Sequence, residues 1–357
     1  MVAATLEPVV ELHSTLEPLR SDWTELAAAS RSFFKTWEWA STWWEEFGAG
    51  RELLVTVVRA GDRVAGIVPL YRWKTRPLRI LRFLGHKTGD ELGPICAAAD
   101  RPLVARALRL ALGGLRWDLL VAEQLPADEG WAALGGRVLV REGNPVLRFG
   151  GDGWDGFLRG RSANFREHVR RWPRKLAREH EVRYRLVDGA TDLQPALSTL
   201  FGLHALRWTG RPSTFRTHEA FHRRVAALAA ERGWLRLWLL EVDGLAVAAV
   251  YGFRFAGVES YYQAGRDPAW HHDHVGFVLL AKAIEQAARD AVAEYRLLRG
   301  AEEYKYRFAT DDPGLETIGL AHGPVAGIGL PVVTALRAAG GPLGRVSRLT
   351  TARFFNA

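Results

Sequence analysis

Two stretches of the chain, starting at residues 53 and 235 and so 182 residues apart, carry the same pattern of apolar and polar residues. Residues 53–73 read LLVTVVRAGDRVAGIVPLYRW and residues 235–255 read LRLWLLEVDGLAVAAVYGFRF, and the two align without gaps. In each, two apolar runs flank a polar turn that contains glycine, which is typical of a β-hairpin. Each hairpin follows a predicted helix, over 36–47 and 219–232. The repeat predicts two domains of one fold, and two ordinary hairpins that resemble each other are the alternative.

The remaining segments fit an α/β (α+β) organisation in both halves. Further strands are predicted over 79–84, 118–123, 138–147, 259–264 and 295–298, and helices over 103–112, 192–208 and 275–290. The glycine-rich stretch 149–153 is the best candidate for a linker, because successive glycines resist regular structure. The length of 357 residues fits two domains. We predict mixed sheets flanked by helices in an N-terminal domain over 1–150 and a C-terminal domain over 151–310, followed by a tail over 311–357 that includes a short helix at 331–339.

The chain is basic, and nearly all of its basic residues are arginines. Its net charge is +8, from 42 arginines and six lysines against 40 acidic residues. The forked guanidinium suits phosphates and carboxylates, so an anionic ligand is one explanation, and the composition of a GC-rich genome is the other. Arg166, Arg170, Arg174 and Arg178 recur every four residues, which predicts a helix with a basic stripe. Pro173 lies within this segment and predicts a kink or two shorter helices.

The sequence favours a cytoplasmic protein that does not cross a membrane. The single cysteine, Cys96, cannot form an intramolecular disulfide, which fits a reducing compartment. Residues 1–15 contain Glu7 and Glu11 where a signal peptide needs a basic segment followed by an apolar run. The most apolar stretches are shorter than the roughly 18 to 20 residues that cross a bilayer.

The order of one strand and one helix in the second half is typical of a donor-binding groove. Residues 261–268 end a predicted strand, and the next helix begins near Gly276. An acyl-CoA transferase parts two strands at such a place and holds the pyrophosphate on the helix N-terminus, where free N–H groups attract anions. The intervening residues 271–274 read HHDH, and a polar turn that caps the helix is the alternative. No metal is expected there, because adjacent ligands rarely converge on one ion.

Two further segments contain candidate proton carriers. Glu302, Tyr304 and Lys305 follow a short predicted strand, and burial could bring the pKa of such a group toward neutrality. A solvated charged segment is the alternative. His204 precedes Arg207 and Trp208 on a predicted helix, where a lone histidine on an apolar face is more often part of the core. Neither a Ser-His-Asp order nor a Walker-type glycine loop is evident.

Several strings in the chain resemble a known family. They are FFKTWEWASTWWEEFG at 33–48, WDLL at 117–120, NFR at 164–166, LHALRW at 203–208, YYQAG at 261–265 and LRGAEEYK at 298–305. Over roughly residues 20–310 the chain resembles the CelD-type branch of the GNAT acyltransferases, named for cellulose biosynthesis. It is similar as well to FemAB-type aminoacyl transferases, which carry two GNAT-like domains in tandem. Members of the branch usually have an aspartate where this chain has Arg296.

The resemblance implies a GNAT acyltransferase in which a splayed strand and a helix N-terminus hold the donor. The acyl group, most simply acetyl from acetyl-CoA or another acyl-CoA, would pass to an amine or hydroxyl of a sugar or cell-surface polymer precursor. The implied donor contacts are Gln263, Gly265 and Gly276, and the implied proton carriers are His204, Glu302 and Tyr304. The implied substrate contacts are Arg166, Arg170, Arg207, Trp208, Arg299 and Lys305. Aminoacyl-tRNA-dependent transfer and a non-catalytic role in polysaccharide assembly are the alternatives.

Overall fold

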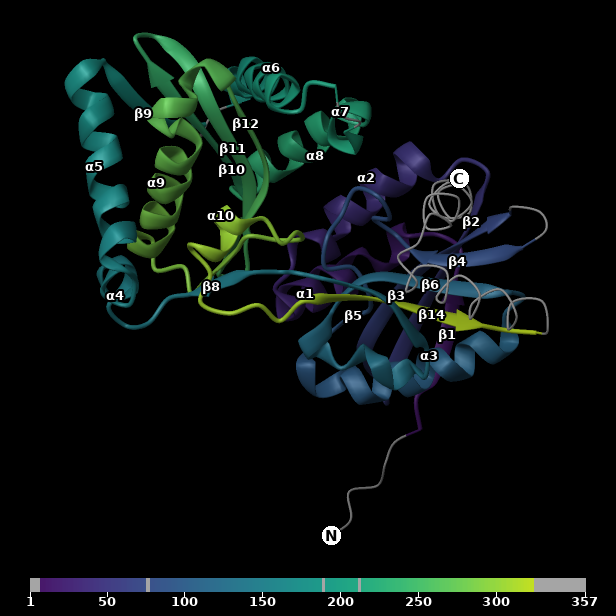
Figure 1. Cartoon of the computed structure of the whole chain (residues 1–357). Coiled ribbons are helices and arrows are strands. Elements are labelled where there is room, and N and C mark those ends of the chain that lie inside the picture. Colours follow the sequence, from purple (N-terminus) through teal and green to yellow (C-terminus); the bar gives the residue numbers. More distant parts are fainter. Residues whose placement is uncertain (1–6, 75–77, 188–189, 211–212, 324–357) are drawn as a thin grey trace, which may run out of the picture.

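The computed structural model describes residues 7–74, 78–187, 190–210 and 213–323. Within these residues the chain forms two lobes, each built on a mixed sheet with helices on both faces (Figure 1). The strand order is β1-β2-β3-β4-β6-β14-β7 in the first sheet, with β5 paired to β3, and β8-β13-β12-β11-β10-β9 in the second. The predicted fold class is therefore confirmed.

The predicted helices and strands are present, with ends that differ by a few residues. The structure adds elements that were not predicted, over 9–13, 20–30, 95–96, 153–159, 182–186, 214–217, 303–306 and 315–321. The first half contains β1 (Val9–His13), α1 (Arg20–Ser30), α2 (Trp37–Phe47), β2 (Arg51–Ala60), β3 (Arg63–Lys74), β4 (Arg79–Phe83), β5 (Ile95–Cys96), α3 (Arg101–Gly114), β6 (Leu119–Pro126), β7 (Arg137–Glu142) and β8 (Val146–Arg148). The second half contains α4 (Gly153–Arg159), α5 (Ala163–Glu179), β9 (Val182–Leu186), α6 (Ala190–Arg207), α7 (Thr214–Thr217), α8 (Glu219–Glu231), β10 (Leu235–Val242), β11 (Leu245–Phe255), β12 (Val258–Arg266), α9 (Val275–Arg289), β13 (Glu294–Arg296), α10 (Glu303–Tyr306) and β14 (Leu315–Ala321).

The repeat seen in the sequence is a repeat of structure. In the hairpin β2–β3, Leu53 pairs with Tyr71, and in β10–β11 the equivalent Leu235 pairs with Phe253. Both ladders shift register at the same point, between Val58 and Arg59 in the first and at the equivalent pair in the second. Each hairpin continues into a third strand, then a helix, then a strand parallel to the third, since β4 pairs with β6 and β12 with β13 in parallel. The two halves therefore repeat one fold.

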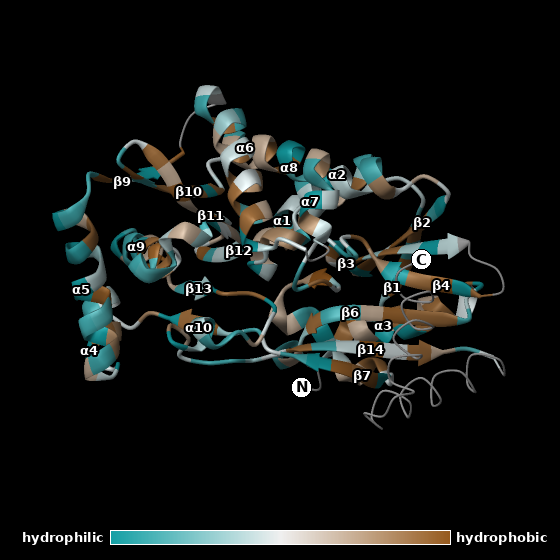
Figure 2. Ribbon diagram, turned by 45° about the horizontal axis from the view of Figure 1, so that its top comes forward, coloured by the Kyte–Doolittle hydropathy of each residue, from teal (hydrophilic) through white to brown (hydrophobic). Residues whose placement is uncertain are grey.

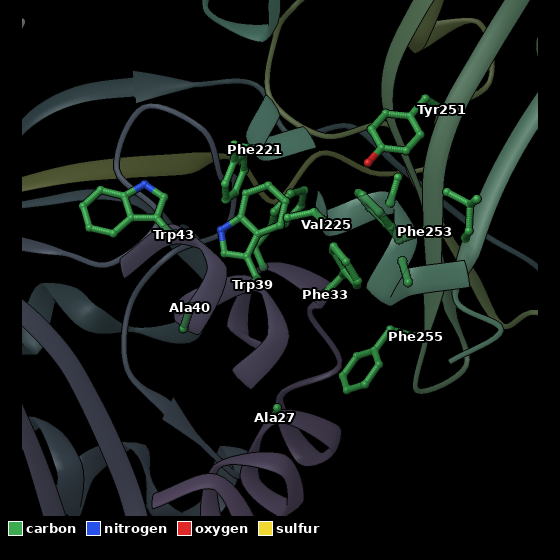
Figure 3. Packing of buried hydrophobic residues seen from close by; sticks show 14 of the residues in the cluster. Ala27, Phe33, Trp39, Ala40, Trp43, Phe221, Val225, Tyr251, Phe253 and Phe255 are labelled. Carbon is green, nitrogen blue, oxygen red and sulfur yellow. The ribbon is translucent and has the colours of Figure 1, made fainter. Parts of the chain in front are cut away.

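The central core lies between the two halves. Side chains of a strand alternate between its faces, so each sheet packs one face on a helix pair and the other on a single helix. Helices α1 and α2 of the first half and α6 and α8 of the second contribute to one continuous apolar cluster, whereas α3 and α9 cover the outer faces. In the shared cluster the ring of Phe33 stacks on that of Phe253, with centroids 3.6 Å apart (Figure 3). Trp39 and Phe221 add an edge-on contact at 5.1 Å, again between the halves.

Two strands pair with the sheet of the opposite half. The predicted strand over 138–147 is wrong in one respect: it is two strands, because Pro145 lacks an N–H for a ladder and the chain changes sheets there. β7 stays in the first sheet, whereas β8 pairs with β13 of the second. In return β14 inserts between β6 and β7 (Figure 2). Sheet pairing thus crosses both predicted boundaries, at 150/151 and at 310/311. Residues 324–357, and with them the helix predicted at 331–339, lie outside the described residues.

The basic segment forms one helix, so of the two alternatives predicted at Pro173, a kink or two shorter helices, the second is wrong. α5 runs through the proline, because Phe165, Trp172 and Leu176 are buried and hold both sides of it on the second half. This apolar face offsets the lost hydrogen bond. Figure 2 shows α5 at the outer edge of the molecule, with hydrophilic residues along much of its length. No helix in the described ranges is both long and apolar enough to cross a membrane.

Candidate active site

Two neighbouring strands of the second sheet separate, as the sequence predicted. β12 and β13 pair in parallel only over three positions, from Val258 with Glu294 to Ser260 with Arg296. Beyond Ser260, β12 continues to pair with β11 but has no strand on its other side in the described structure. The chain after β13 turns away because Leu297 donates its N–H to Pro145 O, 2.9 Å away, and Gly300 takes a φ of 121°. This φ favours glycine over residues with a side chain.

A cavity of about 250 Å³ opens where the strands separate. We call it the slot. Its walls are the end of β12, the start of α9, Trp172 of α5 and Tyr304 of α10. Arg207, Arg266 and Arg307 line it together with His271 and His274, and no acidic residue is among the described residues that do so. The hydrogen-bond ladder of α9 begins with two N–H groups, those of Phe277 and Val278, bonded to His274 O. The N–H groups of Val275 and Gly276 precede that ladder, so the slot suits an anionic ligand.

A second cavity, of about 430 Å³, lies between the two halves. We call it the chamber. The first half contributes Lys87, Thr88, Gly89, Asp90 and Glu142, and the second contributes the end of β12 and the segment 297–305. Acidic and basic side chains are mixed in its walls, in contrast to the slot. Its size is in the range of small-molecule sites.

The slot and the chamber share one wall, formed by Arg207, Tyr261, Ala264 and Tyr304. The hydroxyls of Tyr261 and Tyr304 are hydrogen bonded at 3.1 Å. Arg207 Nη1 donates to Ala264 O at 3.5 Å, and its guanidinium lies 5.9 Å from the centre of the Tyr304 ring. Burial raises the pKa of Tyr304 well above its usual value, so the hydroxyl keeps its proton at neutral pH. The hydroxyl is therefore present as a donor at this wall, and the charge and hydrogen bond of Arg207 partly offset the rise that makes it a weaker acid.

Most of the candidate residues from the sequence line one of the two cavities. The chamber receives Arg207, Trp208, Gln263, Arg299, Glu302, Tyr304 and Lys305. The slot receives Arg207, Gly265, Gly276 and Tyr304. His204, Arg166 and Arg170 line neither cavity. The structure thus brings together nine candidate residues that lie between 207 and 305 in the sequence.

Lys305 and Glu302 form a pair at the base of the chamber. Lys305 is buried, and its Nζ donates to Arg299 O at 2.6 Å and to Leu298 O at 3.3 Å. The same Nζ lies 3.0 Å from Glu302 Oε2. Because these three oxygens occupy its donors, Lys305 holds the turn after β13 in place.

Arg166 and Arg170 lie on α5, away from both cavities. Arg166 is partly buried and donates to Arg161 O, whereas Arg170 is exposed. The arginine stripe therefore runs along the outer surface, and only Trp172 of this helix reaches the slot.

His204 is packed in the core of the second half. It is 2% exposed, and its ring lies 5.0 Å from that of Phe215 and 6.1 Å from that of Trp208. Burial lowers its pKa to about 4, so the ring is neutral at pH 7. This position agrees with the alternative of a core histidine.

The neutral His204 predicts a loss of stability in acid. Since the pKa is depressed in the folded state, the unfolded chain binds the proton first, and stability falls as the pH drops from about 6.5 toward 4. We expect His204 to account for about 3 kcal/mol of this loss. Urea unfolding of His204→Leu at pH 7 and pH 4.5 should show a smaller pH effect than the wild type. An unchanged pH effect would contradict this account.

Gly265 allows β12 to pack directly on the backbone of α6. A Cβ at this position would lie 2.4 Å from His204 N and 2.6 Å from Leu203 C, which is too close for any side chain. We expect Gly265→Ala to destabilise the protein by about 1–3 kcal/mol in urea unfolding, because the backbone must shift. Gly202→Ala, on α6 itself, is the control, because a Cβ at this position would meet no atom within 4 Å. It should stabilise by roughly 0.5–1 kcal/mol.

The sequence reasoning missed the loop of the first half that closes the chamber. Residues 85–93 read GHKTGDELG, and the side chains or backbone of 87–90 line the cavity. Tyr262 of β12 donates its hydroxyl to Thr88 O. Within the loop His86 is buried, with its Nδ1 3.0 Å from Tyr71 Oη and its Nε2 2.8 Å from Arg82 Nη1. The three glycines were a sign of an unusual backbone, but only the contact between halves shows where the loop lies.

Comparison with known proteins agrees with this architecture. Residues 163–306 match the family model described as an acetyltransferase (GNAT) domain. The second half has a GNAT-type acyltransferase fold. Comparison with curated proteins found no match by sequence.

Solved structures resemble nearly the whole chain at low sequence identity. FemX is 10% identical, with a TM-score of 0.62 over 88% of this chain and 97% of that one. The C-terminal domain (DUF2156) of a protein described as a lysylphosphatidylglycerol synthetase from Agrobacterium fabrum is 11% identical, with a TM-score of 0.55 over 90% and 97%. A conserved protein of unknown function from Bacteroides thetaiotaomicron VPI-5482 is 11% identical, with a TM-score of 0.52 over 88% and 100%. At these identities the likeness concerns the fold.

Proposed function

We propose that the protein transfers an acyl group from an acyl-CoA in the slot to an acceptor in the chamber. The observation that supports this most directly is the shared wall: two cavities of different character meet at Arg207, Tyr261 and Tyr304. A basic slot fits the diphosphate of a CoA donor, and a polar chamber fits a hydrophilic acceptor. Acetyl-CoA is the simplest donor. The 1–150 and 151–310 divisions stay our proposal for the two domains, with the donor held by the second.

The proposed reaction depends mainly on orientation. The diphosphate binds beside Arg266, Arg307 and the start of α9, and the thioester reaches the shared wall along the free edge of β12. An amine or hydroxyl in the chamber then attacks the carbonyl carbon and loses a proton to a base in the chamber wall, and the carbon–sulfur bond breaks. Tyr304, which is protonated at neutral pH, donates its proton to the leaving thiolate. Gln263, Trp208 and Glu302 contact the acceptor side of this wall in the proposal.

The acceptor in this proposal is a sugar or a cell-surface polymer precursor, as the CelD-type resemblance implies. The reaction would take place in the cytoplasm, where acyl-CoA is available. The charged walls of the chamber support a hydrophilic acceptor of this kind.

A melting assay with a panel of donors tests the donor assignment. Acetyl-CoA at 100 times its dissociation constant should stabilise the protein by about 2.7 kcal/mol. Arg266→Gln and Arg307→Gln should weaken this stabilisation, whereas Arg174→Gln, an exposed arginine outside the slot, should not. If no acyl-CoA raises the melting temperature of the wild type, the proposal fails and a non-catalytic role in polysaccharide assembly is favoured.

A tRNA-linked donor is a second candidate, supported by one observation. Arg170, Arg174 and Arg178 are exposed on α5, the helix that also contributes Trp172 to the slot. A tRNA bound along this surface would bind with steep salt dependence. The double variant Arg170→Gln/Arg174→Gln should reduce both the affinity and the salt slope. Undetectable tRNA binding at low salt eliminates this candidate.

A further inference from the structure

Acidic and basic side chains from facing elements line the chamber. Some of them keep hydrogen-bonding capacity that their partners do not use. Lys305 and Glu302 are paired, and Arg207 belongs to the shared wall. Asp90, from the first half, lines the chamber with 12% of its side chain exposed. Within the described residues no hydrogen bond reaches its carboxyl group, and its nearest cationic partner is Arg299 at 3.7 Å between Oδ1 and Nε. That separation is an ion pair but too long for a hydrogen bond.

Arg299 faces Asp90 from the turn after β13. Its side chain is 42% exposed and lines the chamber. Gln124, with its amide oriented to satisfy both neighbours, accepts from Arg299 and donates to Gly89 O beside the loop. The guanidinium is thereby held with donors left for a ligand, since it has five N–H groups. Asp90 and Arg299 present opposite charges to the same cavity.

We propose that the acceptor is a small molecule carrying both an amine and an anionic group, that Asp90 removes the proton of the amine, and that Arg299 binds the anion. This inference rests on the proposed acyl transfer and adds the acceptor class and the base. Asp90 takes one proton from the ammonium, and the freed nitrogen lone pair forms the bond to the acyl carbon. The carbon–sulfur bond breaks, and the sulfur receives the proton of Tyr304. The second proton of the nitrogen restores that of Tyr304, and Asp90 releases its proton to solvent.

The surroundings of Asp90 favour this role. Burial raises the pKa of Asp90, and Arg299 and Lys305 oppose that rise. Glu91 of the same loop and Glu142 at the end of β7 raise the pKa further, and Tyr262 of β12 faces the same carboxyl. A carboxylate whose pKa is raised is a stronger base, and the charge of Arg299 favours its ionised form.

A matched set of sugar phosphates tests the acceptor class without any donor. The probes are glucosamine 6-phosphate, glucosamine, which lacks the anion, and glucose 6-phosphate, which lacks the amine. We expect the full chain to bind glucosamine 6-phosphate about 10-fold tighter than either of the others in calorimetric titration. Asp90→Asn should abolish the advantage over glucose 6-phosphate, and Arg299→Gln the advantage over glucosamine. Asp62→Asn, at an exposed hairpin turn, should preserve both.

The inference is overturned if glucosamine 6-phosphate binds no tighter than the better single-group probe, or if its advantage survives Asp90→Asn. A kinetic measurement then separates a base from a binding group. Asp90→Asn should lower kcat/KM for the amine about 100-fold or more and remove the acid limb of its pH profile, while stabilisation by acetyl-CoA is retained. If acetyl-CoA does not stabilise the wild type, the proposed donor is rejected. The comparison of the three probes tests the acceptor class separately.

Discussion

Replacing Phe253 with alanine is expected to lower the free energy of unfolding by about 3–5 kcal/mol, the cost of removing a fully buried phenyl ring. Phe253 is completely buried, stacks on Phe33 and has Trp39 and Tyr262 within 6.4 Å between ring centroids. Because these partners come from both halves, the cavity would open between the two sheets (Figure 3). Urea unfolding followed by tryptophan fluorescence measures the loss.

Leu245→Ala is the matched control for this experiment. Leu245 lies on the same strand and is 72% exposed, so its removal should change the stability by less than about 0.5 kcal/mol. The shared core further predicts that Phe253→Ala lowers the stability of both halves in one transition. A variant that unfolds the second half while the first keeps its wild-type transition would contradict the single core between them.

Replacing Tyr304 with phenylalanine is expected to reduce kcat by roughly 100-fold, because the proposed proton donor to the leaving thiolate is lost. The ring stays, so the contact with Arg207 and the shape of the shared wall are preserved. Loss of the hydrogen bond to Tyr261 should cost about 1 kcal/mol of stability, which leaves the protein folded. Steady-state turnover of acetyl-CoA with an amine acceptor measures kcat, and melting with acetyl-CoA checks that donor binding is intact.

Tyr306→Phe provides the control two residues away. Its hydroxyl donates to Asp312 at 2.6 Å on the surface, outside both cavities. The same atom is removed, but turnover should stay at the wild-type level. Equal turnover of Tyr304→Phe and the wild type would remove Tyr304 from the proton transfer, and the shared wall would then serve to orient the substrates.

Local patterns in the sequence predicted the elements of this fold well. Both hairpins and the helix before each follow from apolar periodicity and glycine placement, which act over a few residues. The separation of the strands near Gln263 was expected from the likeness to acyl-CoA transferases. The basic stripe on α5 was predicted correctly, but Pro173 did not divide the helix, because the buried Trp172 and Leu176 hold both sides of it. Tertiary packing there overrode a local preference.

Local patterns did not predict which of the candidate residues line the cavities. Tyr304 and Arg207 line both cavities, whereas His204, on the same helix as Arg207, points into the core. One helix presents several faces, and the sequence indicates an apolar face without indicating what lies against it. Asp90 was missed for a related reason, since it is more than 200 residues from Arg299 in the sequence and approaches it only when the two halves pack.

By itself the sequence determined that the chain has two halves of one fold, each with a hairpin and flanking helices. It also indicated a basic turn that contains glycine in the second half. These features depend on spacing along a short piece of chain. Only the tertiary structure decided that β8 and β14 pair with the sheet of the opposite half, that one aromatic core joins the halves, and that the loop at 85–93 closes the chamber. Such contacts depend on which distant surfaces bury each other, and burial is a property of the packed molecule rather than of any segment.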